Sequence, residues 1–182
     1  MSGPILWLKY YIPATLELMV FSFIISLIVG QTMGVISGYF RDSWFDNLFR
    51  VIAYIGVATP AFAMAIFFLL IFSYILNVAP AVGRLSIAMT PPPQITGFLI
   101  FDSLITGEFG TAWAAFTHII LPAASLALAN ATQEGRITLS SIIDNLHKDY
   151  ITAHIVHGIP IRTVVFKYLL KPSLIPTMSI MG

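Results

Sequence analysis

The sequence contains no cysteine, which excludes disulfide bonds, thiol catalysis and thiolate metal sites. Charge is also scarce, since Asp, Glu, Lys and Arg make up 9% of the chain against roughly 25% in an ordinary soluble domain. The formal net charge of +1 gives no electrostatic support for a nucleic-acid partner. Residues 1–13 lack the basic start and short apolar core of a secretory signal peptide. A chain so poor in charge is typical of an integral membrane protein.

Apolar residues make up 58% of the chain, and charge is missing from three long stretches, 18–40, 51–83 and 109–133. Each stretch exceeds the roughly 20 residues that a helix needs to cross a hydrocarbon core of about 30 Å. Backbone polar groups in lipid must be satisfied within the segment, so helix is expected throughout. The sequence therefore predicts an all-α, polytopic helical membrane protein.

One partial transmembrane domain is expected over residues 1–182. Its complete spans are predicted near 14–40, 51–79 and 111–131, and a fourth apolar run begins at 173–182. Ten residues cannot cross a bilayer, which suggests a fragment of a longer protein.

Lys and Arg are distributed unevenly among the connections. Loop 41–50 holds two basic residues and the longer loop 84–110 holds one, whereas segment 134–171 holds five. Basic residues favour the cytoplasmic side, so 41–50 and 134–171 are expected in the cytoplasm and 84–110 outside. The N-terminus would then lie outside, which suggests a preceding span.

Small residues recur every four positions along the first predicted span, at Ser22, Ser26, Gly30, Gly34 and Gly38. They form a small-residue stripe on one helix face. Such residues let another membrane helix approach closely, so the stripe is interpreted as a helix-packing surface rather than as the lining of a pathway.

Prolines and acids outside the stripe receive structural interpretations. Pro60 and Pro122 are expected to kink the second and third spans, since proline removes a backbone hydrogen bond. Residues 96–110 are interpreted as a short helix at the outer membrane surface. Its acids, Asp102 and Glu108, are interpreted as solvated caps and surface charges rather than as contacts to a docking protein or substrate.

No catalytic, cofactor or metal site is predicted. Glu17 lies at the edge of its span, from which it can reach the interface, and His118 is isolated. His147, His154 and His157 could share one helix face, but no HExxH or other fixed ligand pattern is present. There is no GxSxG and no glycine-rich phosphate loop. If nucleotide drives this protein, another chain binds it.

The basic segment is ordered as a helix, a sharp turn and a second helix. Residues 134–156 have helical character and continue the third span. Gly158 supplies a left-handed residue that ends a helix, and Pro160 fits the first turn of a short helix expected over 161–170. The prolines of 172–176 mark the return to the membrane. A soluble partner could bind this helix-turn-helix.

These residues resemble the coupling region of permease subunits in binding-protein-dependent ABC importers, specifically the B-type subunit of the dipeptide, oligopeptide and nickel group. That group carries a stretch like R-x-T-x-x-S-x-x-E-x-L-x-x-D-Y, then a Gly and an L-I-P triplet. The matching residues are Arg136, Thr138, Ser141, Asp144 in place of Glu, Leu146, Asp149, Tyr150, Gly158 and Leu174 to Pro176. The runs at 13–18, 96–104 and 120–128 are similar too, so the resemblance covers nearly the whole chain.

The chain also departs from the pattern. The general permease signature has Glu-Ala-Ala and, after three residues, Gly, whereas this chain has Thr152, Ala153 and His154 before Gly158. Peptide-group members commonly lack that Glu, but they keep a small residue at the position of His154 and a basic one at that of His157. The departure indicates altered contact chemistry with the ATPase or a divergent lineage.

The resemblance implies a six-span permease subunit in the inner membrane of a prokaryote, of which this chain would lack the first span and most of the last two. The subunit would not itself be an enzyme. The implied partners are a second, C-type permease subunit, two ATPase subunits, a periplasmic or extracellular substrate-binding protein and membrane lipid. The implied ATPase-coupling loop consists of Asp149, Tyr150, Thr152, Ala153, His154, His157, Gly158 and Arg162.

Peptides are the implied cargo, with nickel and oligosaccharides left open. Two other classes remain: a small helical assembly or anchor subunit, and a secondary transporter. A secondary transporter binds substrate at the membrane midplane through broken helices and charged residues, and no charge lies in the interior of the predicted spans. Co-purification with an ATPase would favour the permease.

Overall fold

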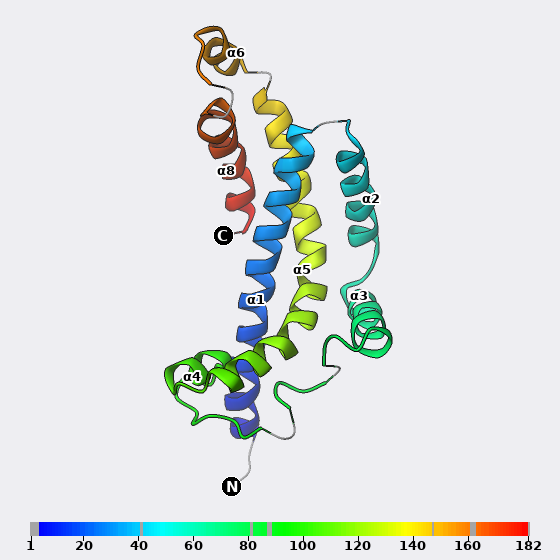
Figure 1. Ribbon diagram of the computed structural model, residues 1–182, viewed down its shortest axis with the longest axis vertical. Helices are drawn as coiled ribbons and strands as arrows, with labels where there is room; N and C mark the ends of the chain where they lie inside the picture. The colour runs from blue at the N-terminus through cyan, green and yellow to red at the C-terminus, as the bar shows by residue number, and fades with distance from the viewer. Residues whose placement is uncertain are drawn as a thin grey trace. The chain divides into compact units, whose positions relative to one another are not determined.

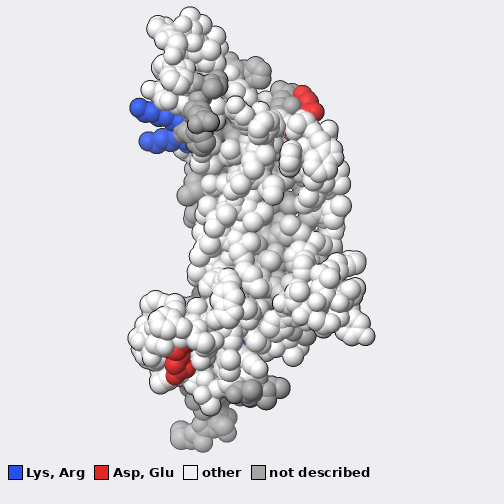
Figure 2. Space-filling model, viewed as in Figure 1, with Lys and Arg blue, Asp and Glu red and all other residues white. Residues whose placement is uncertain are grey.

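The computed structural model describes residues 4–40, 42–80, 82–86, 89–146, 148–160 and 163–181. They form helices joined by irregular connections (Figure 1). No strand occurs in these ranges, which confirms the predicted all-α class. Figure 2 shows one face of the protein, on which few side chains carry charge.

The two longest helices are α1 (Pro4–Tyr39) and α5 (Phe109–Leu146). The Tyr10–Tyr39 part of α1 and the whole of α5 are long and apolar enough to cross a membrane. Pro122 lies inside α5 without ending it. The third predicted span, 111–131, is thus the first part of a helix that continues for several more turns.

The stretch predicted as the second span, 51–79, is interrupted instead of forming one continuous helix. Its pieces are α2 (Trp44–Ala58), α3 (Ala61–Phe68) and the π-helical turn η1 (Leu69–Ile75), which continues α3. The interruption falls at Pro60, which has no N–H to donate, and Thr59 before it is extended, with φ −96° and ψ 126°. The kink expected from Pro60 is therefore a break.

The contacts divide the chain into two units, each with its own packing. The first comprises Met1–Ile25 and Pro60–Ala127, and the second comprises Ser26–Thr59 and Leu128–Gly182. The first unit includes the short helix α4 (Leu99–Ile105), so the short helix expected in the 84–110 loop is present.

Inside the second unit, α1 and α5 run in the same direction. A β-carbon on Gly30 would lie 2.6 Å from the carbonyl oxygen of Ala131, and one on Gly38 would lie 2.8 Å from Cγ2 of Ile142. Residues further along α1 thus contact residues further along α5, as in two parallel helices. Two membrane spans with the same direction require the chain to cross back between them.

Helix α2 runs opposite to α5. Near the start of α2, the Phe49 ring lies 2.6 Å from where a β-carbon on Gly135 would be, and near its end a β-carbon on Gly56 would lie 2.9 Å from Cγ2 of Thr132. The return crossing therefore begins with α2.

The coupling segment differs from the prediction at its first helix. The helix does not continue unbroken to residue 156, because α5 ends at Leu146 and a separate helix, α6 (Asp149–Val156), follows. Ile142 and Ile151 are nine residues apart, about two and a half turns at roughly 3.6 residues per turn, so one straight helix would place them on opposite faces. The break lets both side chains enter one buried cluster.

The second helix of the segment continues past its predicted end at residue 170. A π-helical turn, η2 (Val164–Leu169), leads directly into α8 (Leu170–Met181), so Pro172 and Pro176 lie within helix instead of ending it. The π-helical turn ends three residues before Pro172, whose missing N–H interrupts regular α-helical bonding.

Candidate functional site

The residues predicted for the coupling loop lie on α6 and the turn after it (Figure 1). Those on α6 are Asp149, Tyr150, Thr152, Ala153 and His154, and those directly after it are His157 and Gly158. Arg162 and His147 lie outside the described residues.

The chain reverses sharply after α6 because of the backbone of Gly158. Its φ is +74°, the left-handed conformation expected there, which residues with a β-carbon rarely adopt. The N–H of Gly158 donates to the carbonyl of Ile155 at 3.0 Å, and the N–H of Ile159 donates to that of His154 at 3.1 Å. This pair of bonds is the Schellman motif, which fixes the direction of the chain leaving the helix.

Helix α6 is held by one buried side chain and exposes apolar ones. Ile151 is 2% exposed and packs in a cluster with Ile142, Val164 and Leu169. Near the end of α6, Ile155 is 50% exposed and Val156 is 79% exposed. Exposed apolar side chains on a short, firmly held helix are typical of a docking surface.

The structure gives His154 a packing role. Its ring centroid lies 4.0 Å from that of Tyr168, with the planes tilted by 34°. His154, which stands where members of the resembled permease group keep a small residue, thus fills the space over η2. His157 is exposed, and its Nδ1 lies 2.7 Å from the carbonyl oxygen of Ala153.

The small-residue stripe faces α5 in the second unit. A β-carbon on Gly34 would lie 2.5 Å from the carbonyl oxygen of Gly135, closer than real β-carbons approach a neighbour. Ser26 donates its hydroxyl to Oε1 of Glu134 at 2.8 Å. Ser22, in the first unit, is also buried. Glycine at positions 30 and 34 therefore permits contact with the backbone of α5.

Glu134 corrects the expectation that no charge lies in the interior of the spans. It is 8% exposed, and its partner Ser26 lies near the middle of the Tyr10–Tyr39 stretch. Its Oε2 has no hydrogen-bond partner in the described part of the chain. The charge gap ended at Glu134 in the sequence, but the helix and its packing continue through this residue.

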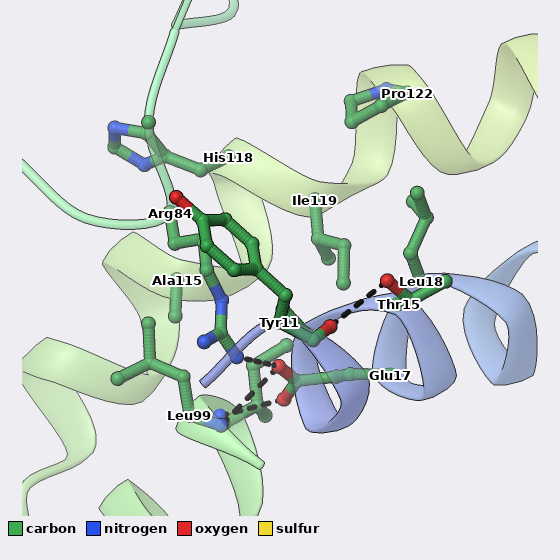
Figure 3. A pocket seen from close by; sticks show the side chains of 13 residues that line it. Tyr11, Thr15, Glu17, Leu18, Arg84, Leu99, Ala115, His118, Ile119 and Pro122 are labelled. Carbon is green, nitrogen blue, oxygen red and sulfur yellow. Dashed lines mark hydrogen bonds and ion pairs between the residues drawn. The ribbon is translucent and has the colours of Figure 1, made fainter. Parts of the chain in front are cut away.

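A pocket of about 290 Å³ lies in the first unit and is drawn in Figure 3. It is bounded by α1, α4, α5 and the connection at Gly83 and Arg84. His118 lies at its wall, with Nδ1 2.7 Å from the carbonyl oxygen of Ala114. The walls are mainly apolar, so the pocket suits an apolar group.

Glu17, in this pocket, does not reach the interface as expected, because it is 4% exposed. Its Oε2 accepts from Nη2 of Arg84 at 2.6 Å and from the N–H of Leu99 at 3.2 Å, and its Oε1 accepts from the N–H of Ile100 at 2.8 Å (Figure 3). The guanidinium of Arg84 also stacks on Tyr10. Glu17 therefore joins α1, α4 and the loop between η1 and α4.

Asp102 is likewise buried, at 2% exposure, and not solvated as expected. It accepts from the N–H groups of Ile95, Thr96 and Gly97 and from the Thr96 hydroxyl. Burial acts to raise the pKa of Asp102, but these hydrogen bonds outweigh it and lower the pKa below its usual value. Glu108 is exposed, and its carboxylate accepts from the Thr111 hydroxyl.

Comparison with known proteins places this architecture among transport proteins. Residues 30–182 match the model of the family described as binding-protein-dependent transport system inner membrane component. The matched region contains α2 to α8 and most of the small-residue stripe.

Three curated relatives illustrate the similarity. The probable D,D-dipeptide transport system permease protein DdpB of Escherichia coli (strain K12) is 34% identical over 96% of this chain and 52% of its own length. The dipeptide transport system permease protein DppB of Alkalihalophilus pseudofirmus is 36% identical over 94% and 51%. The putrescine export system permease protein SapB of Escherichia coli (strain K12) is 32% identical over 96% and 55%. The chain spans about half the length of the curated relatives it matches.

Proposed function

Since this chain belongs to the family of binding-protein-dependent transport system inner membrane components, we propose that it forms part of the permease subunit of an ATP-driven importer. Two of the three relatives described above carry dipeptide in their names, and one carries putrescine. Di- or oligopeptides are therefore the proposed cargo. The proposed partners are a C-type permease subunit, two ATPase subunits and a substrate-binding protein, and the subunit itself is not the ATPase.

Helix α6 and its Gly158 turn are the proposed docking site for an ATPase subunit. The observation that carries this assignment is the exposed apolar end of α6, at Ile155 and Val156, on a helix whose direction is fixed by the Schellman motif. The basic residues of 41–50 and 134–171 support a cytoplasmic location for this end.

The packing around Ile151 provides a route for coupling. Its cluster joins α6 to Ile142 of α5, to Val164 and Leu169 of η2, and so to α8. A partner that moves α6 would therefore move α5 and α8 with it, as a rigid-body displacement. Helix α5 in turn contacts α1 along the stripe, so the displacement would reach two membrane spans.

A secondary transporter is the second candidate, and Glu134 is the observation that favours it. A carboxyl buried among membrane helices marks ion or proton pathways in many transporters. Such a transporter would need neither an ATPase nor an exposed apolar helix at the cytoplasmic side. The permease proposal explains the exposed end of α6, which the secondary transporter leaves without a role.

We expect Val156→Asp to lower co-purification of ATPase subunits with the full-length protein by about tenfold or more. The substitution places a charge on an apolar docking surface, where burying it unpaired costs at least about 1.4 kcal/mol, or one tenfold step. Val156 is 79% exposed, so the fold should not suffer. Affinity purification from native membranes followed by quantification of bound ATPase provides the measurement.

The matched control is Val82→Asp, because Val82 is also highly exposed, at 82%, and lies two residues before the loop 84–110 that is expected outside. It should leave ATPase recovery unchanged. Equal recovery with both variants, or no ATPase with the unmodified protein, would count against docking at α6.

A further inference from the structure

Two arginines line a pocket of the second unit whose lining residues belong neither to α6 nor to the pocket of Figure 3. Its volume is about 240 Å³, and its lining residues are Phe49, Arg50, Ala53, Tyr54, Arg136, Leu139, Ser140 and Ile143. An adjoining pocket of about 350 Å³ shares Arg136 and Ser140. We call the two together the arginine pocket. It brings cationic and hydroxyl donors next to apolar side chains.

The guanidinium of Arg50 is held in a fixed position. Its Nε donates to Oδ1 of Asp46 and its Nη2 to Oδ2, both at 3.0 Å. Asp46 is 0% exposed and also accepts from the Ser37 hydroxyl and the N–H of Asp42. The Asp46 carboxylate is thus occupied by partners inside the protein. The other N–H groups of Arg50 make no hydrogen bond within the described part of the chain, so they can donate to an anion.

Arg136 supplies a charge that no carboxylate of the described residues balances. Among the described residues no ion pair joins Arg136 to an acidic side chain, and its guanidinium lies 6.0 Å from the ring centroid of Tyr54. Arg136 and Ser140 are both exposed, one turn apart on α5. Together with Arg50 they form a set of donors suited to the oxygens of a phosphate group.

The arginine pocket also lies at a depth that suits a lipid headgroup. Gly135, next to Arg136, contacts Gly34 of α1. Gly34 is about ten residues past the midpoint of the Tyr10–Tyr39 stretch, or about 15 Å at roughly 1.5 Å per residue. Half of a hydrocarbon core of about 30 Å is the same distance, so the guanidinium groups reach the boundary between acyl chains and headgroups.

An apolar surface beside the arginine pocket offers room for acyl chains. On α2, which carries Arg50 and Tyr54, exposed apolar side chains lie before and after Tyr54. The exposed fractions are 54% for Val51, 42% for Ile52, 65% for Tyr54 and 53% for Ile55. A headgroup held by the arginines would leave its chains along this surface.

We propose that the arginine pocket binds the phosphate headgroup of an anionic phospholipid. Arg136 and Arg50 donate to the phosphate oxygens, the Ser140 hydroxyl donates a third hydrogen bond, and Tyr54 lies at the interface beside them. In the orientation proposed above, the lipid belongs to the cytoplasmic leaflet. The site itself does not depend on ATP coupling or on the identity of the cargo.

The test compares lipid binding by the full-length protein and its variants. Purified protein is incorporated into nanodiscs containing phosphatidylglycerol and phosphatidylcholine in equal amounts, and co-purifying lipid is quantified after extraction into detergent. We expect the unmodified protein to retain phosphatidylglycerol in preference to phosphatidylcholine. Arg136→Gln should lower that retention by about tenfold, because it removes the charge-assisted hydrogen bonds from the guanidinium to the phosphate.

Three variants make the result specific. Lys148→Gln removes one exposed positive charge outside the arginine pocket and should leave lipid retention unchanged. Arg136→Lys keeps the charge and should restore part of the retention. Ser140→Asp introduces a negative charge at an exposed position and should also lower retention. It tests the same site if Arg136→Gln does not fold.

Other outcomes would overturn the proposal. Equal retention of the two lipids by the unmodified protein would show that the arginine pocket does not select an anionic headgroup. Equal loss of phosphatidylglycerol in Lys148→Gln and Arg136→Gln would indicate general surface charge. Displacement of the lipid by millimolar inorganic phosphate would assign the arginine pocket to a soluble anion instead.

Discussion

Replacing Gly34 by leucine should strongly destabilise the folded protein. A β-carbon at this position would lie 2.5 Å from the carbonyl oxygen of Gly135 and 2.8 Å from Cβ of Thr138, and neither atom can move without shifting α5. Overpacking of a tight contact costs about 1–3 kcal/mol or more, against a total stability of about 5–15 kcal/mol. Gly34→Ala should therefore lower the thermal unfolding midpoint measurably in detergent, and Gly34→Leu should lower it further or prevent purification.

Gly110 supplies the matched control for this prediction. It lies in α5, and apart from its own stretch of helix no atom of the described residues lies within 4 Å of where its β-carbon would be. The free energies of unfolding of Gly110→Ala and Gly110→Leu should lie within about 1 kcal/mol of that of the unmodified protein, because glycine in a helix is itself slightly unfavourable. A Gly34→Leu protein as stable as Gly110→Leu would mean that α1 and α5 do not pack along the stripe.

Removal of the Glu17 carboxylate should produce the second large effect. Glu17→Ala leaves the guanidinium of Arg84 and the N–H groups of Leu99 and Ile100 without their acceptor in a buried site. Breaking a buried ion pair by removing one partner typically costs about 3–5 kcal/mol. Unfolding of the purified protein, followed by the loss of helical signal with temperature, provides the measurement.

A double variant separates the ion pair from the other contacts of Glu17. Glu17→Ala with Arg84→Ala should be less destabilised than the sum of the single variants, because the second substitution removes the unpaired charge. Glu108→Ala is the control, since Glu108 is exposed and binds only the Thr111 hydroxyl in the described residues, and its loss should cost less than about 0.5 kcal/mol. A double variant whose loss of stability equals the sum of the two single losses would contradict a buried ion pair between Glu17 and Arg84.

Much of the fold can be predicted from the distribution of charge and small residues. Long charge-free stretches must be helical in lipid, and α1 and α5 lie where two of them were expected. The stripe at Gly30, Gly34 and Gly38 indicates that another helix packs closely against it, although the sequence does not indicate which helix. The family resemblance drawn from the segment beginning at Arg136 is confirmed by the match over residues 30–182.

Buried charges were the main source of error. The ends of the spans were placed at charged residues, which assumes that every charge faces water. Glu134 instead pairs with Ser26, and Glu17 pairs with Arg84, across 108 and 67 residues of sequence. No local pattern connects residues so far apart. For Asp102 a local signal existed, because Thr96 and Gly97 lie just before it and can supply donors to its carboxylate.

Breaks within helices were also hard to place. Pro60 predicts a kink, but the helix breaks there completely, and α2 and α3 pack in different units. The break before α6 has no proline or glycine to mark it. It follows from the need to bury Ile151 together with Ile142, which is a tertiary effect that overrides helix propensity.

The central claim is ATP-driven import, and uptake into proteoliposomes tests it most directly. The full-length protein, purified with its associated subunits, is reconstituted with ATP on the ATPase side and a labelled dipeptide plus the substrate-binding protein on the other. We predict accumulation of the dipeptide that requires both ATP and the binding protein and that is lost with Val156→Asp. Accumulation driven by an ion gradient without ATP, and unaffected by Val156→Asp, would contradict the account and support a secondary transporter.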